Sequence, residues 1–163
     1  MSDASRARRL ELLEVLTVGL PFCGFKVLTG LTFASAQSPV VRLLAAALIG
    51  LGGLDAMINV ASLAGLAFAE GRPTDACVFA LATRPLRRPP RSPRAWQDFG
   101  NSLDILLSFA LVALMIGGGL LRGMPADRLT VWNACVILNV LGAGLGRFDE
   151  SLRNLSRASA SLE

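Results

Sequence analysis

The stretch LLAAALIGLGGLDAMINVASLAGLAF, from Leu43 to Phe68, decides the fold class of this chain. It is long enough to cross a bilayer as one helix, because a span needs about 20 apolar residues. Its single charged residue is Asp55. A carboxylate at mid-bilayer costs about 2.5–3.5 kcal/mol on insertion scales, so it usually has a partner, a water-filled cavity or a proton. The stretch predicts an integral membrane protein and makes Asp55 the first candidate functional residue.

Three further apolar blocks have similar lengths, at about residues 10–33, 103–121 and 129–145. With the block at 43–68 they predict four membrane-spanning helices. The composition agrees, since 53% of the residues are hydrophobic and 17% are charged. The small residues at 34–36 leave a signal peptide open as an alternative for the first block, although Lys26 inside it favours a retained helix. We expect a single all-α membrane domain over residues 1–163, folded as a four-helix bundle.

Arginines gather before the first helix, in a proline-rich loop at residues 70–100, and after the fourth helix. Cytoplasmic segments carry an excess of basic residues, so this distribution predicts that both termini are cytoplasmic. The preference for arginine over lysine suggests a bacterial protein, and hence a multi-pass protein of the inner membrane. The loop cluster is a candidate contact for anionic lipids, whereas no recognition motif suggests nucleic acid. Its members are Arg84, Arg87, Arg88, Arg91 and Arg94.

Polar residues on the second helix form the main candidate site. Asp55, Asn59 and Ser62 are spaced i, i+4 and i+7, so they share one helix face. Asn139, near the centre of the fourth helix, is the candidate partner across the bundle. Two interpretations stay open. Asp55 takes up and releases a proton beside a polar pathway, or these side chains only join helices through hydrogen bonds.

Three charged residues outside this face have separate predicted roles. Lys26 is expected several residues closer to the outer surface than Asp55, which favours an anion-attracting outer vestibule of Lys26 and Arg42 over a direct ion pair. Asp104, close to the predicted start of the third helix, is interpreted as part of a helix N-terminal cap. The segment at 76–82 is a candidate for a short interfacial segment that lies along the membrane.

Small residues at helical spacing predict close helix packing or contact between copies of the chain. They are Ala61 and Gly65 in the second helix and Gly142 and Gly146 in the fourth. The chain has no histidine and three scattered cysteines, so imidazole metal sites and Ser-His-Asp catalysis are excluded. We expect no enzyme activity, no metal and no cofactor.

The layout resembles the YqhA-like family of small bacterial inner-membrane proteins. The resemblance is carried by four spans, an acid in the second helix, a polar loop leading through Trp96 into NSLD (101–104), and a last helix ending GRFDESLR. It implies a role in the movement of small organic acids. We expect a small homo-oligomeric transporter or channel for organic acids or ions, with Asp55 as the candidate proton carrier of a proton-linked mechanism. The alternative is a non-catalytic accessory or scaffold subunit of a larger membrane complex.

Overall fold

The computed structural model describes residues 3–68, 77–83, 85 and 93–160, and every regular element in them is helical. In chain order these are α1 (Asp3–Glu14), the π-helical turn η1 (Val15–Gly19), α2 (Leu20–Phe33), α3 (Pro39–Phe68), α4 (Val78–Ala82), α5 (Pro93–Gly117), the 3₁₀ turn η3 (Leu120–Gly123) and α6 (Ala126–Ala160). Four described stretches are long and apolar enough to cross a membrane: Arg8–Phe33, Pro39–Phe68, Ala95–Gly117 and Ala126–Gly146. The prediction of an all-α chain with four membrane-length helices is confirmed.

The third span differs from its predicted bounds. α5 begins at Pro93, inside the predicted loop, and ends at Gly117. Proline suits the first position of a helix, because the N–H that it lacks would have no partner there. Gly119 then has a φ of 67°, a left-handed conformation that glycine adopts easily, and it separates α5 from η3. Asp104 therefore lies well inside a helix, and its interpretation as part of an N-terminal cap is wrong.

The first span contains a widened turn immediately before Pro21. The amide of Leu20 bonds to the carbonyl of Val15, five residues back, which is the spacing of a π-helix. Proline has no N–H and its ring would clash with the carbonyl four residues earlier, so a regular α-helical turn is unfavourable here. The π turn accommodates this defect while α1, η1 and α2 continue as one helical rod.

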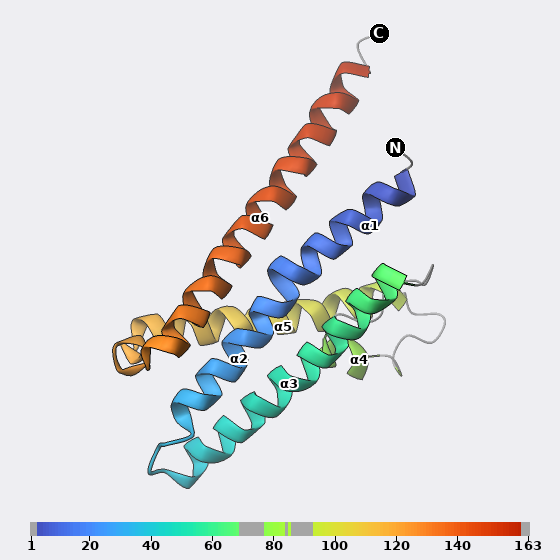
Figure 1. Ribbon diagram of the computed structural model, residues 1–163. Helices are drawn as coiled ribbons and strands as arrows, with labels where there is room; N and C mark the ends of the chain where they lie inside the picture. The colour runs from blue at the N-terminus through green and yellow to red at the C-terminus, as the bar shows by residue number, and fades with distance from the viewer. Residues whose placement is uncertain (1–2, 69–76, 84, 86–92, 161–163) are drawn as a thin grey trace.

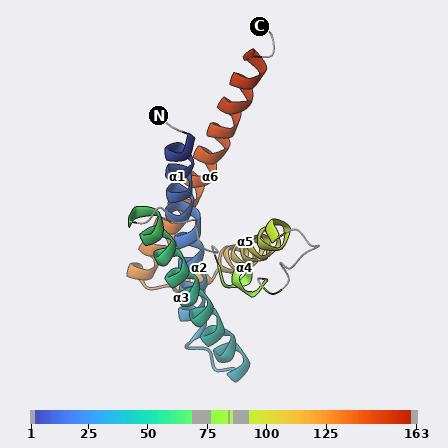
Figure 2. The ribbon, with the colours of Figure 1, turned by 90° about the vertical axis from the view of Figure 1, so that its right-hand side faces the viewer.

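The rod of α1, η1 and α2 is the centre of the bundle. α3 runs antiparallel along one side of it and α6 along another (Figure 1). α5 crosses the rod obliquely and is seen nearly end-on, with α4 beside it, in Figure 2. The start of α1, the end of α3 and the C-terminal part of α6 lie toward the same end of the molecule (Figure 1). A hydrogen bond from Arg8 Nε to the carbonyl of Leu66 joins two of these ends.

Glycines allow α2 and α3 to pack very closely. A Cβ atom on Gly30 would lie 2.8 Å from the carbonyl oxygen of Ala45, and one on Gly52 would lie 2.9 Å from that of Cys23. These contacts set the register of the antiparallel pair and place residue 52 level with residues 23–27.

On the other side of α2, buried side chains of α2, α5 and α6 and of the turn before α6 form an apolar core. Its buried members are Phe22, Phe25, Leu28, Met115, Met124 and Trp132.

The four residues predicted to mediate close packing have different surroundings. Gly142 is buried, and a Cβ atom there would lie 2.0 Å from Thr17 Oγ1. Gly146 is exposed, and a Cβ atom at Gly146 or Gly65 would meet nothing within 4 Å. Ala61 is exposed on α3. Of these four residues, Gly142 alone shows close packing within the described part of the chain, and contact between copies stays a prediction for the others.

Gly142→Ala is expected to destabilise the protein by about 1–3 kcal/mol, because the added methyl group overpacks the contact between α6 and η1. Thr17 cannot turn away freely, since its hydroxyl donates to the carbonyl of Leu13 at 2.7 Å. Gly146→Ala is the control and is expected to be neutral or slightly stabilising, because alanine favours helix. Thermal unfolding in detergent would compare them, and equal midpoints for the two variants would contradict the prediction.

Candidate functional site

The only lysine of the chain lies at the centre of the candidate site. Lys26 of α2 has an exposed fraction of 0%, and its Nζ donates to Asp55 Oδ2 of α3 at 2.5 Å. Nζ also donates to Asp104 Oδ1 of α5. Three spans thus each contribute one charged side chain to a single buried cluster, which we call the Lys26 triad (Lys26, Asp55 and Asp104).

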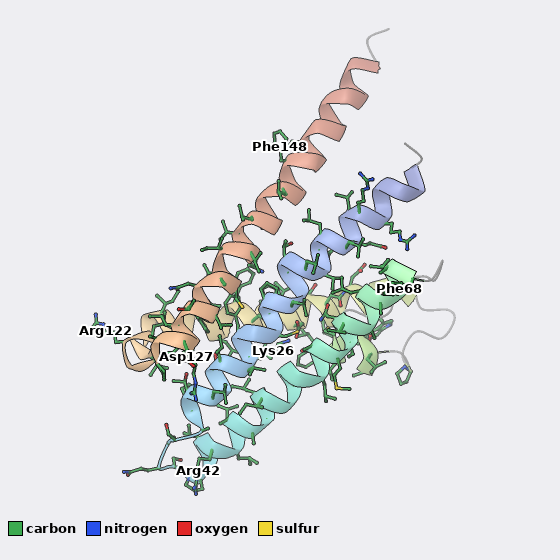
Figure 3. All side chains as sticks on the ribbon, in the orientation of Figure 1. Lys26, Arg42, Phe68, Arg122, Asp127 and Phe148 are labelled. Carbon is green, nitrogen blue, oxygen red and sulfur yellow. The ribbon has the colours of Figure 1, made fainter. Side chains whose placement is uncertain are left out.

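The predicted outer vestibule of Lys26 and Arg42 is wrong. Arg42 is exposed near the turn between α2 and α3, whereas Lys26 lies inside the bundle (Figure 3). The helix register places Lys26 about one turn from Asp55 along the axis, so the predicted offset exists. One turn is about 5.4 Å, and the lysine stem is long enough to span it. A direct ion pair was not expected from the sequence because the reach of the Lys26 side chain was underestimated.

Asp55 also fixes the position of α4. Its Oδ1 accepts a hydrogen bond from the backbone amide of Val78 at 2.6 Å, at the start of α4. Cys77 caps the same helix, because its sulfur accepts from the amide of Ala80 at 3.4 Å. Burial raises the pKa of the Cys77 thiol to about 11, so it stays protonated at neutral pH. α4 therefore packs against α5 and α3 with Ala80 buried, while Leu81 and Ala82 are exposed. A position along the membrane surface stays a prediction for this segment.

The polar face predicted on the second helix is buried in the structure. Asp55, Asn59 and Ser62 have exposed fractions of 1%, 1% and 4%. Asn59 Nδ2 donates to the backbone carbonyl of Asp55 at 2.9 Å, and Ser62 Oγ donates to that of Ile58 at 2.9 Å. The side chain of Asn59 lies over Gly19 in η1, where a Cβ atom would be 2.3 Å from Asn59 Oδ1. Glycine at this position gives the amide its space.

Asn139, the predicted partner across the bundle, makes no hydrogen bond to the triad within the described residues. Asn139 is half-buried on α6, and within the described part of the chain its Nδ2 makes no hydrogen bond. α6 packs against α1, η1 and α2, and none of its described side chains lines the cavity between the other three spans. Of the basic loop cluster, Arg84, Arg87, Arg88 and Arg91 lie outside the described residues, as does the side chain of Arg94.

A cavity of about 210 Å³ leads to the triad between the first, second and third spans. Its lining comprises Glu11, Glu14, Val15, Val18, Gly19 and Phe22 from the first span, Asn59, Ser62 and Leu66 from α3, Cys77, and Gln97, Asn101, Asp104 and Ile105 from α5. Glu14 is exposed, whereas Phe22 and Asp104 are buried. The cavity therefore runs inward from the end of the molecule where α1 begins.

Asp104 was not selected from the sequence as a site residue, yet it joins the cavity to the triad. A signal for it existed, because Asp104, like Asp55, is an acid within an apolar block. Because Asp104 was placed near a helix start, this signal was missed.

Among the described residues, no group of three His, Cys, Asp or Glu side chains is arranged to hold a metal ion. Protein-family models, curated proteins and solved structures give no match to this chain.

Proposed function

We propose that this chain is a small multi-pass transporter or channel of the bacterial inner membrane, with both termini in the cytoplasm. The observation that supports it most is the cavity that ends at a charged cluster buried among three apolar spans. Ionisable residues within membrane helices are costly, and they commonly mark ion, proton or substrate pathways. With the proposed orientation, the cavity opens toward the cytoplasm.

The charge of the triad supports a proton-linked mechanism. One ammonium group faces two carboxylates, so the cluster carries a net charge of −1 when all three groups are ionised. A proton or a bound cation would neutralise this buried charge, and its release would restore it. Movement of small organic acids, which the resemblance to the YqhA-like family implies, stays a hypothesis for the transported solute.

Asp55→Asn is expected to lower proton-linked flux at least tenfold. Asparagine keeps the size of the side chain and an oxygen that can accept from Val78, but it cannot exchange a proton. The assay is proton, organic-anion and cation flux in proteoliposomes, with wild type and variant at matched oligomeric state. Asp98→Asn, an exposed change on α5, is the control and should keep wild-type flux. Unchanged flux in Asp55→Asn would argue against a role for this carboxylate in transport.

One observation favours the alternative of an accessory subunit. The span Ala126–Gly146 in α6 is the least buried of the four, and this helix exposes Val140, Leu141 and Leu145. Such a helix is suited to packing against another membrane protein or a second copy of the chain. Stoichiometric co-purification of a different membrane protein, together with no flux by the isolated chain, would support this alternative.

A further inference from the structure

The cavity follows matching faces of three helices into the bundle. From Glu11 to Phe22, its lining on the first span covers eleven residue steps, or about 16 Å at 1.5 Å per residue. Leu66 on α3 and Gln97 on α5 lie toward the outer part of the lining, and Asn59 and Asp104 lie deeper. A solute entering from the end where α1 begins would reach Asp104.

The charge of the lining disfavours anions. Three lining residues are acidic, Glu11, Glu14 and Asp104, and none of the described lining residues is basic. Arg8 lies close to the outer end, but its guanidinium donates to the carbonyl of Leu66. Lys26 does not line the cavity and is already bonded to two carboxylates. A negative charge in this low-dielectric space would meet repulsion, whereas a positive charge would be attracted.

Asp104 is the member of the triad that meets the cavity. Its side chain has an exposed fraction of 10%, compared with 0% for Lys26 and 1% for Asp55. Asp104 Oδ1 accepts from Lys26 Nζ, and within the described residues Oδ2 accepts no hydrogen bond. A carboxylate that is nine-tenths buried thus keeps one oxygen for a ligand, and a cation at Oδ2 would not need to displace Lys26.

The remaining walls suit a short apolar group. Val18, Phe22, Leu66 and Ile105 line the cavity together with the acids. The ring of Phe22 can also attract a cation through its π-electrons. Ligand sites commonly combine apolar walls with a few polar groups that fix orientation. A volume of about 210 Å³ leaves room for only a small molecule.

We propose that this cavity binds a small amphipathic organic cation, an alkylammonium, with its charged end at Asp104 Oδ2 and its alkyl chain against the apolar wall. The proposal deepens the proposed transport function by naming the substrate class of the same cavity. If the cavity binds an alkylammonium, the transported solute is an amine and not a small organic acid.

The test measures the binding of n-butylammonium to the purified full-length protein in detergent by isothermal titration calorimetry. Butyrate is the matched probe, with a similar chain and the opposite charge. We expect n-butylammonium to bind and butyrate to give no signal. Binding of butyrate with equal affinity, or no binding of n-butylammonium, would overturn the proposal.

Two variants separate the charge of the site from its shape. Asp104→Asn should weaken n-butylammonium binding at least tenfold, yet it leaves Lys26 paired with Asp55, so the fold is expected to persist. Ile105→Trp, at a partly exposed lining position, should weaken binding by filling the cavity without changing its charge. Asp98→Asn is the control and should bind like wild type. Wild-type affinity in Asp104→Asn would overturn the proposal.

The same protein assayed for flux distinguishes the two proposals. Binding of n-butylammonium without any flux in proteoliposomes would support the amine site and overturn the transport function. Flux of protons or organic anions without n-butylammonium binding would support transport and overturn the amine site. Flux of n-butylammonium that is lost in Asp104→Asn would support both.

Discussion

Lys26→Met is expected to destabilise the folded protein by about 3–5 kcal/mol, the usual cost of removing one partner from a buried ion pair. Without the ammonium group, Asp55 and Asp104 would face each other as uncompensated charges inside three apolar spans. Methionine has a similar length, so lost packing contributes little. The measurement is the unfolding midpoint in detergent, followed by circular dichroism.

Two further variants make this result specific. Arg42→Met removes an exposed cation near the turn between α2 and α3 and should change stability by no more than about 0.5 kcal/mol. Adding Asp55→Asn and Asp104→Asn to Lys26→Met removes both unpaired charges, so much of the lost stability should return. A midpoint for Lys26→Met equal to that of wild type would show that the carboxylates do not need the lysine.

Gly52→Ala is expected to lower the free energy of unfolding by about 1–3 kcal/mol or more, the second largest expected effect. Overpacking at this position cannot be relieved by the movement of a flexible side chain alone. The new methyl group would lie 2.9 Å from the carbonyl oxygen of Cys23 and 3.0 Å from Lys26 Cβ. It would push α2 away from α3 at the level of the triad. We therefore expect weakened transport in addition to a lower unfolding midpoint.

The neighbouring glycine provides a matched control. A Cβ atom at Gly53 would meet nothing within 4 Å. Gly53→Ala adds the same methyl group one position along α3 and should be neutral or stabilising by up to about 1 kcal/mol through helix propensity. If Gly52→Ala were as stable as Gly53→Ala in the same unfolding experiment, the close packing of α2 on α3 would not hold in solution.

Part of the candidate site was predictable from the sequence, and the contacts that were missed were missed for identifiable reasons. Asp55, Asn59 and Ser62 could be assigned to one face because helical spacing is local. Asp104 was misplaced because prolines and arginines before it suggested a long loop, whereas Pro93 begins a helix. The link between Asp55 and α4 joins residues 23 apart in the chain, and no local pattern encodes it.

The sequence by itself determined that the chain is all-helical with four apolar segments of membrane length. Length, hydropathy and helical spacing are properties of neighbouring residues, and they need no knowledge of the fold. Only the tertiary structure decided that Lys26, Asp55 and Asp104 meet and that Asp104 faces a cavity. The physical reason is that these contacts depend on helix register, on glycines that allow close approach and on the reach of a lysine side chain across one turn.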